Sequence, residues 1–368
     1  MVKNVGLDKL IIITVVFLLL FGLIMIYNAT MLLAKEKYAD SFYFFKKQIL
    51  WIAVGLVIFS FISLMKNPVY LNQKFIFLVL VVSIAGLLMV FFMGKINNTY
   101  RWIRFAGLSV QPSEFAKISA ILYLSYLFGK KKYDVNNLKK LIVLLIPVFI
   151  IELLILKEPD YGNFFLILML TMIILFVAGL KLRYFIVAFM LISVLTFVTL
   201  KLSPERMNRI MAYLNPQEYA STYNFQTTQS IYGLGSGGIF GRGLGKSTQK
   251  LYFLPYAYTD FIYSIIGEEV GLIGALLILG LFFVFLIRGL LIAKQSGNLQ
   301  TYLLGVGLTF LIISQALLNI SVTLGILPTK GIPLPFVSIG GSSLIASLVI
   351  AGILVNISKH RKMVFLND

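Results

Sequence analysis

Acidic residues just before and within an apolar segment are the first candidates for chemistry in this sequence. The segment LPYAYTDFIYSIIGEEVGLIGALLILGLFFVFLI (254–287) contains Asp260, Glu268 and Glu269. Ionised groups at such depth are costly and often mark a functional site. With no Cys and a single His, His360, the chain cannot form a thiolate nucleophile, a Cys/His zinc site or a buried His base. Catalysis would therefore depend on carboxylates, amines, hydroxyls or a cation bound by oxygen ligands.

A second group of candidates lies in RWIRFAGLSVQPSEFAK (101–117). Pro112 suits the first turn of a helix, and Glu114 would then lie near the positive end of the helix dipole. Lys117 follows three residues later on the same face, so the two charges can pair just inside the membrane. Two interpretations remain open: an ion pair that fixes helix packing, or a pair that orders or contacts a substrate.

The turn EPDYGN (158–163) adds Glu158 and Asp160 between two apolar segments. Asp160 or Asn163 could cap the following helix, or Asp160 could belong to a site. Glu152 lies in the apolar segment that precedes this turn. It is an acid within the membrane that must pair, become protonated or face water.

Two glycine-rich stretches resemble anion-binding loops. Residues 233–238 fit G-x-G-x-x-G and GRGLGKS (241–247) resembles a P-loop, but no βαβ pattern surrounds the first and the second lacks its first glycine. We therefore expect that the chain binds no nucleotide. We expect the glycines to let a loop lie close to the membrane or to a phosphate-bearing ligand. In LPTKGIPLPFVSIGGSS (327–343), Lys330 adds a cation, and Ser342 and Ser343 could hold an anionic oxygen or serve close helix packing.

Helical periodicity separates the three acids of the first segment. On a regular helix, a column of small residues would share one face with Asp260: Ser264, Gly267, Gly271 and Gly274. This face predicts a groove beneath Asp260 that suits a lipid-tailed substrate, although helix packing with Asp260 as a cap would give the same pattern. Glu268 and Glu269 fall on other faces, where we expect them to hold the helix against its neighbours or the long loop.

The elements that position these residues must cross a membrane. Mean hydropathy is +0.94 and only 12% of residues are charged, which excludes a soluble domain. About ten segments are long enough to span. They cover residues 10–32, 48–65, 74–94, 112–129, 139–156, 163–180, 182–200, 261–292, 301–326 and 338–357. The sequence thus predicts an all-α polytopic protein with one integral membrane domain (1–368) and a large extracellular loop (201–260) between the seventh and eighth helices.

Charge sets the predicted orientation and partners. Lys and Arg are more frequent in the loops that share a side with both ends of the chain, which places both termini in the cytoplasm. All the polar motifs then lie on the outer side. The net charge of +18 is spread over short loops, which favours anionic headgroups and diphosphates over nucleic acid.

Two long, ungapped motifs carry a family resemblance. GLGKSTQKLYFLPYAYTDFIYSIIGEEVGLIG (243–274) and PTKGIPLPFVSIGGSS (328–343) resemble the SEDS family (shape, elongation, division and sporulation), which includes FtsW, RodA and SpoVE. The sequences of these motifs are most similar to those of the FtsW group. They differ in that Tyr256 and Tyr258 replace the Glu and His of the usual FtsW motif PEAHTDF.

The resemblance implies a peptidoglycan glycosyltransferase that polymerises lipid II at the outer face of the bacterial cytoplasmic membrane. It implies inverting transfer with Asp260 as general base, a class B penicillin-binding protein and other divisome membrane proteins as partners, and a role in septal wall synthesis. Elongation or sporulation is the alternative role.

The resemblance also assigns residues. Glu114 and Lys117 match the family's membrane ion pair, Asp160 its EPD-type acid, and Lys330, Ser342 and Ser343 its last motif. Candidates to stabilise the departing diphosphate, besides Lys330, are Arg101, Arg104, Arg242 and Lys246. Mg²⁺ or Mn²⁺ could assist, whereas we expect no haem or zinc.

Two other functions would use the same residues. Lipid II transport would need polar groups along the whole membrane depth, and Glu152 is the one candidate near mid-bilayer. A non-enzymatic scaffold for partner helices would leave Asp260 replaceable.

Overall fold

The structure is a helical bundle with one small hairpin. The computed structural model describes residues 7–94, 99–105, 108–130, 134–187, 190, 204–250, 254–255 and 257–359. Its long helices are α1 (Lys9–Tyr38), α2 (Tyr43–Leu64), α3 (Gln73–Met89), α4 (Pro112–Gly129), α5 (Leu138–Lys157), α6 (Tyr161–Val177), α10 (Ile262–Lys294), α11 (Leu299–Thr323) and α12 (Gly341–Lys359). The shorter elements are η1 (Val69–Leu71), η2 (Val90–Phe92), α8 (Pro204–Leu214), α9 (Phe225–Gly237) and the strands β1 (Ile103–Phe105) and β2 (Leu108–Val110).

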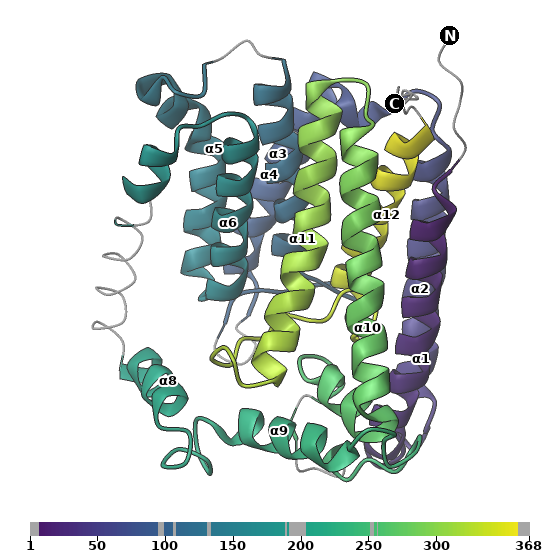
Figure 1. Ribbon diagram of the computed structural model, residues 1–368. Helices are drawn as coiled ribbons and strands as arrows, with labels where there is room; N and C mark the ends of the chain where they lie inside the picture. The colour runs from purple at the N-terminus through teal and green to yellow at the C-terminus, as the bar shows by residue number, and fades with distance from the viewer. Residues whose placement is uncertain are drawn as a thin grey trace, which may run out of the picture.

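The long helices run side by side, and α8 and α9 lie across one end of the bundle (Figure 1). Helix α1 begins and α12 ends at the opposite end. The long loop predicted for residues 201–260 is therefore ordered in large part and caps one end of the bundle. We call this the α8–α9 end.

Nine of the ten predicted spans coincide with helices of the described residues. Six of these helices are long and apolar enough to cross a membrane by length and composition: α1, α2, α3 with η2, α10, α11 and α12. The seventh predicted span (182–200) falls largely outside the described residues. The all-α membrane architecture is confirmed, while the count of ten spans stays a prediction.

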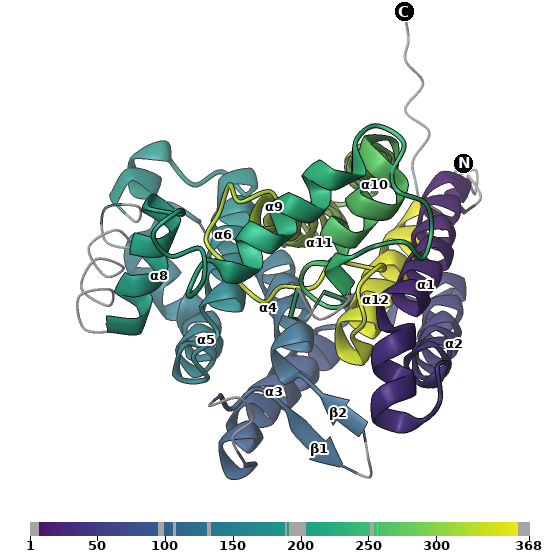
Figure 2. The ribbon, with the colours of Figure 1, turned by 90° about the horizontal axis from the view of Figure 1, so that it is seen from below.

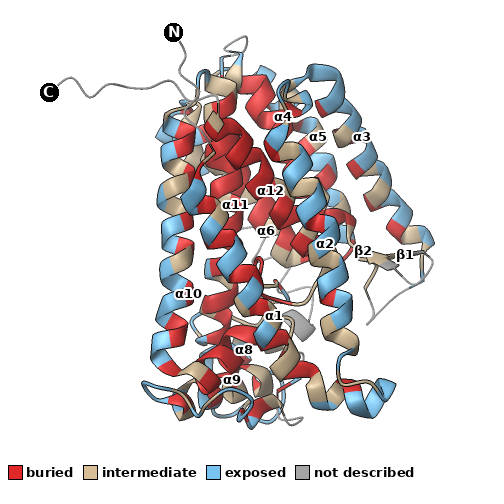
Figure 3. Ribbon diagram, turned by 90° about the vertical axis from the view of Figure 1, so that its right-hand side faces the viewer, coloured by how far each residue is buried: buried red, intermediate tan, exposed pale blue. Residues whose placement is uncertain are grey.

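Helix α4 forms the centre of the bundle, next to α11 and α12, and these three helices are mostly buried (Figure 3). Helix α2 instead exposes large apolar side chains such as Val57 and Phe61. Apolar side chains that face outward on a membrane-crossing helix suit lipid rather than water. The bundle thus has a protein-enclosed centre and a lipid-facing rim.

One small hairpin, which was not predicted from the sequence, accompanies the helices. β1 and β2 pair antiparallel, with Ile103 opposite Val110 and Arg104 opposite Ser109, and project from the bundle near α3 (Figure 2). The chain then enters α4 at Pro112, which lies in its first turn as predicted. Polar and apolar residues alternate within 103–105 and within 108–110, a period of two that suits a strand.

Candidate active site

Asp260 lies just before α10 rather than on it. The helix begins at Ile262, its N-cap is Phe261, and no side chain caps it. The interpretation of Asp260 as a helix cap is therefore wrong. The backbone is fixed from α11 instead, because the Asn319 amide donates to the carbonyl oxygens of Asp260 and Ile332, both at 2.8 Å.

Asp260 lines a pocket of about 160 Å³ at the α8–α9 end. The lining residues are Arg209, Tyr223, Gln226, Asp260, Phe261, Thr329, Lys330 and Gly331. Gly331 lies against the carboxylate: a β-carbon there would be 3.0 Å from Asp260 Oδ2. The pocket thus brings together α8, α9, the start of α10 and the 327–343 motif, which the sequence alone could not join.

The electrostatics of this pocket link four of the predicted residues. Burial raises the pKa of Asp260 to about 7, and the positive charge of Arg101 opposes this shift. Burial lowers the pKa of Lys330, and the negative charge of Asp160 opposes that. The Lys330 ammonium also lies 4.6 Å from the centre of the Phe165 ring. The charge of Arg101 therefore acts on Asp260, and the charge of Asp160 acts on Lys330, from beside the pocket.

Glu158 lies beside this group and is fully buried. Neither of its carboxylate oxygens has a hydrogen-bond partner within the part of the chain that the structure describes. Burial, followed by the charge of Asp160, raises the pKa of Glu158 to about 8, so it is largely protonated at neutral pH. A neutral Glu158 avoids placing a second negative charge against Asp160.

A continuous polar network leads from Arg101 to Glu114. Arg101 donates to the Pro159 carbonyl and its Nε lies 3.9 Å from Asp160 Oδ2. Asn163 donates to Asp160 Oδ2 at 2.8 Å and accepts from Lys117 Nζ at 3.0 Å. Lys117 Nζ in turn lies 2.8 Å from Glu114 Oε1. The predicted ion pair is present, and the amide of Asn163 joins it to Asp160.

Hydrogen bonding and burial indicate the structural roles of Asp160 and of the Glu114–Lys117 ion pair. Asp160 Oδ1 accepts from the Asn163 backbone N–H at 3.3 Å, so Asp160 caps α6. The side chains of Glu114 and Lys117 are 3% and 1% exposed. Burial at this level favours an ion pair that orders the site over one that contacts a substrate directly.

Ser342 and Ser343 lie in the first turn of α12 and are buried. Ser342 Oγ accepts from the Gln111 backbone N–H at 2.9 Å, and the Gln111 amide donates to Asp160 Oδ2 at 3.3 Å. Gly341 lies against the Trp51 ring, where no β-carbon would fit. These contacts support close packing of α12 against α2 and the start of α4 over binding of an anionic oxygen.

The small-residue face of α10 is filled by protein rather than open to lipid. Ser264 Oγ donates to the Ser230 carbonyl of α9 at 2.8 Å. Gly267 packs against Leu234 of α9, and Gly271 against the loop that follows α9. The predicted groove beneath Asp260 is therefore wrong, and the packing interpretation of these small residues is correct. Gly271 also breaks the helix (φ 76°, ψ −168°), so a regular helical wheel does not hold across it.

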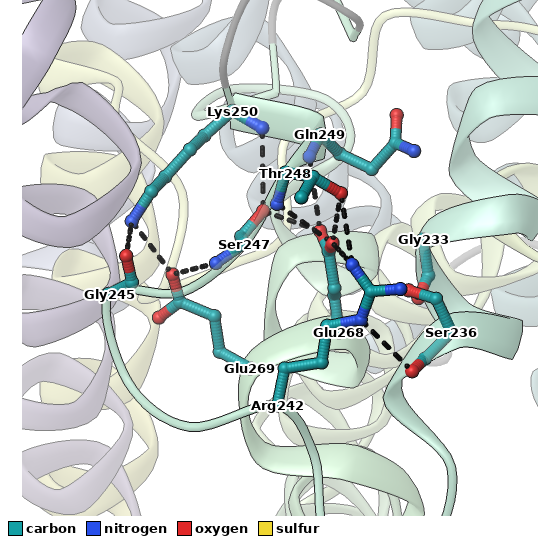
Figure 4. A network of polar contacts seen from close by, with 10 residues as sticks. All are labelled: Gly233, Ser236, Arg242, Gly245, Ser247, Thr248, Gln249, Lys250, Glu268 and Glu269. Carbon is teal, nitrogen blue, oxygen red and sulfur yellow. Dashed lines mark hydrogen bonds and ion pairs between the residues drawn. The ribbon is translucent and has the colours of Figure 1, made fainter.

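Glu268 and Glu269 hold the loop at 242–250, as expected (Figure 4). Glu268 accepts from Ser247 Oγ at 2.5 Å, from the Thr248 backbone N–H at 2.8 Å and from the Gln249 backbone N–H at 3.3 Å. Glu269 accepts from Lys250 Nζ and from the Asn28 amide of α1, both at 3.1 Å. Both acids are buried and act as anchors.

The remaining basic candidates are divided between two places. Arg104 lies in β1, and Arg101 precedes it near Asp160. Arg242 donates to Thr248 Oγ1 at 3.2 Å and lies 3.5 Å from Glu268 Oε1, within the loop that the two acids anchor. Lys246 is exposed in the same loop. Neither Arg242 nor Lys246 is among the residues that line the Asp260 pocket.

Sequence reasoning did not predict the linking roles of the polar neutral residues of the site, although Asn163 was a candidate helix cap. Gln111 and Asn163 join the charged groups, Asn319 fixes the backbone of Asp260, and Tyr223 and Gln226 line the pocket. A signal was present for Asn319, because an amide inside a span must find partners. Tyr258 differs from the residue usual in the FtsW motif, and the centre of its ring lies 5.6 Å from that of Phe44. Tyr256 lies outside the described residues.

Comparison with known proteins identifies the family. Residues 8–363 match the family model FTSW_RODA_SPOVE, described as "Cell cycle protein". The chain is a SEDS family member. It is 38% identical over 97% of its length to a probable peptidoglycan glycosyltransferase FtsW of Trichlorobacter lovleyi, with 94% of that protein covered. It is also 38% identical over 98% of its length to the stage V sporulation protein E of Bacillus subtilis, with 99% covered.

Solved structures share the SEDS fold. A chain in a study titled "Structural coordination of polymerization and crosslinking by a peptidoglycan synthase complex" superposes with a TM-score of 0.80 at 23% identity, covering 96% of this chain and 98% of that one. The rod shape determining protein RodA of Thermus thermophilus superposes with a TM-score of 0.70 at 24% identity, covering 97% and 98%. The chain is therefore a multi-pass SEDS membrane protein.

Proposed function

We propose that this SEDS protein is a peptidoglycan glycosyltransferase that polymerises lipid II. The observation that carries the proposal is the Asp260 pocket, in which a partly buried carboxylate with a pKa of about 7 lies among cationic side chains. The curated relatives named peptidoglycan glycosyltransferase FtsW, one 38% identical over nearly the whole chain, support the same activity.

Asp260 is the general base of the proposed reaction. As the hydroxyl oxygen of the acceptor sugar forms a bond to the anomeric carbon of the donor strand, its proton passes to Asp260, and the bond to the lipid diphosphate breaks with inversion. A base is most effective when its pKa lies near the working pH, because it is then ionised and still basic enough to accept a proton. Burial provides this pKa, and Arg101 keeps it from rising further.

Lys330 and Arg101 are the cations placed to stabilise the departing diphosphate. Lys330 lines the pocket, and Arg101 acts electrostatically on Asp260. Because both are partly desolvated, their charges are less screened than those of surface groups. Arg104, Arg242 and Lys246 become secondary candidates, and Arg242 in particular already pairs with Glu268.

A divalent cation is a further part of the proposal. Over the described ranges, no three acidic or histidine side chains gather closely enough to hold a metal ion. Mg²⁺ or Mn²⁺ would therefore need substrate phosphate oxygens together with one or two carboxylates. We assign no step of the reaction to a metal.

The proposed setting is the bacterial cytoplasmic membrane, with both termini in the cytoplasm and the Asp260 pocket outside. A transpeptidase of the class B penicillin-binding type is the proposed partner, together with other divisome proteins. Support comes from the structural neighbour studied in a complex for polymerisation and crosslinking. The FtsW-like sequence motifs support a role in septal synthesis, while the equally similar sporulation relative makes sporulation the alternative role.

Reconstitution tests the proposed activity. Purified protein with its cognate penicillin-binding partner is expected to convert lipid II into glycan strands on a gel that separates strands by length. If the protein instead moves lipid II across proteoliposomes and forms no polymer, the protein is a transporter and the proposal is wrong.

A further inference from the structure

The loop that follows α9 completes the broken backbone of α10. In a regular helix the carbonyls of Glu268 and Glu269 would accept from the N–H groups of Leu272 and Ile273. The break at Gly271 separates these partners. The Glu268 and Glu269 carbonyls accept instead from the Arg242 and Gly243 N–H groups, at 2.9 and 3.0 Å.

The other half of the break is closed in the same way. The N–H groups of Leu272 and Ile273 donate to the carbonyls of Gly238 and Ile239, at 2.9 and 3.3 Å. Four hydrogen bonds from residues 238–243 thus replace two bonds of the helix. These four backbone groups of α10 therefore have protein partners, as irregular backbone at membrane depth requires.

Three of the side chains that this loop presents outward are large and apolar. Ile239, Phe240 and Leu244 are 60%, 80% and 61% exposed, and we call these three residues the loop patch. Because Ile239 is hydrogen-bonded to Ile273, the loop patch is continuous with an exposed apolar surface on α10 that includes Ile273 and Leu276. Three large apolar side chains exposed together in one loop indicate a surface that contacts lipid or another protein.

The exposure of side chains along α10 indicates the depth of the loop patch relative to the membrane. Residues Ile262–Glu269 are buried in protein, whereas apolar side chains become exposed from Leu272 onward. From Leu272 to the end of α10 at Lys294 the helix rises about 34 Å at ~1.5 Å per residue. This length matches a hydrocarbon core of about 30 Å, so Leu272 lies at its boundary and the loop patch beside it.

We propose that the loop patch inserts into the bilayer leaflet at the α8–α9 end, among the upper acyl chains and headgroups. Arg242, which is exposed between Ile239 and Leu244 in the sequence, would then lie at the level of lipid phosphates. The insertion seats the 242–250 loop, and with it Glu268 and Glu269, at a fixed depth. The proposal is independent of the glycosyltransferase function, because the position of a side chain can be measured without turnover.

The absence of Cys from the sequence allows a direct test. Single variants Phe240→Cys and Leu244→Cys would carry an environment-sensitive fluorophore in phosphatidylglycerol–phosphatidylcholine vesicles. Leu276→Cys on the exposed face of α10 is the matched lipid control, and Glu218→Cys, exposed in the segment between α8 and α9, is the water control. Quenching is measured with lipids that carry a nitroxide near the top of the acyl chain and with aqueous iodide.

The proposal predicts that labels at 240 and 244 lose fluorescence to the nitroxide lipids as the label at 276 does, and resist iodide. The label at 218 should do the opposite. Iodide quenching at 240 and 244 equal to that at 218 would overturn the proposal. Protection that develops only after a penicillin-binding partner is added would also overturn it, by making the loop patch a protein interface. A matching thermal transition for each labelled variant checks its fold.

Discussion

The Glu268 carboxylate accepts a hydrogen bond from the Thr248 backbone N–H at 2.8 Å, across a gap of twenty residues in the sequence. It is one of several contacts by which a buried acid of α10 fixes the loop that precedes Asp260 (Figure 4). Glu268 thus provides acceptors for backbone N–H groups of the loop that would otherwise lack them, which accounts for an acid at this place. We therefore infer that Glu268 positions the chain.

Replacing Glu268 should therefore loosen this loop. In Glu268→Gln the charge is lost and one acceptor becomes an NH₂ donor, which leaves a backbone N–H of the loop without a partner. We expect a loss of about 1–3 kcal/mol in the free energy of opening this loop, read as faster hydrogen exchange at residues 247–249. The exposed Glu218→Gln is the control, and exchange equal to that control would contradict the anchoring role.

Gly271 and Gly280 form a matched pair within α10. Gly271 has φ 76° and lies against Gly241 and Ile239, whereas a β-carbon at Gly280 would meet nothing within 4 Å. Gly271→Ala should destabilise the protein by at least about 1–3 kcal/mol, the cost of placing alanine in a backbone region that essentially only glycine adopts. Gly280→Ala should be neutral or stabilise by up to about 1 kcal/mol. Thermal unfolding in detergent measures both, and equal transitions would refute the break at Gly271.

The buried pair of Glu114 and Lys117 should behave as a unit. Glu114→Gln or Lys117→Met alone leaves one buried charge without its partner, and each should cost about 3–5 kcal/mol of stability. The double variant should lose clearly less than the sum of the two. Chemical unfolding of the four proteins gives the coupling energy.

Activity separates the two roles left open for this pair. A folded double variant that still forms glycan strands would support an ordering role, in line with side chains that are 3% and 1% exposed. A folded but inactive double variant would indicate direct contact with the substrate.

The sequence predicted much of the fold because lipid imposes simple rules on helices. Apolar length located nine helices, and Pro112 and the three-residue spacing of Glu114 and Lys117 predicted the start of α4 and its ion pair. The groove beneath Asp260 failed for a physical reason. A helical wheel assumes unbroken α10, and it cannot tell that α9 packs on the small residues.

The site was predictable only in its charged members. Asp260, Lys330 and Asp160 stood out as costly charges near a membrane. The structure places Asp260 and Lys330 in one pocket, and the charge of Asp160 acts on Lys330. The amides of Asn163 and Asn319 act through contacts across 46 and 59 residues of sequence. Such long-range partners depend on tertiary packing, which no local pattern encodes.

The pH dependence of activity should report on Asp260. A general base must be ionised, so activity should be low below a pH of about 7 and rise as the pH passes through the pKa of Asp260. Arg101→Gln removes the positive charge that opposes the rise of this pKa, so the midpoint should move to higher pH. Arg101→Lys keeps the charge and should leave the midpoint in place.

Lys330 and Arg209 also line the pocket and stay the same in both Arg101 variants, so a difference between the two isolates the charge at 101. A midpoint that is identical in Arg101→Gln and the unmodified protein would contradict the electrostatic link between Arg101 and Asp260.

The measurement that tests the central claim most directly is glycan polymerisation by Asp260→Asn. The substitution keeps the size of the side chain and the backbone bond to Asn319 while removing the base. The variant should match the unmodified protein in thermal unfolding and in assembly with its penicillin-binding partner, yet form no strands from lipid II. Strands of normal length and amount from the folded variant would contradict the assignment of Asp260 as the general base.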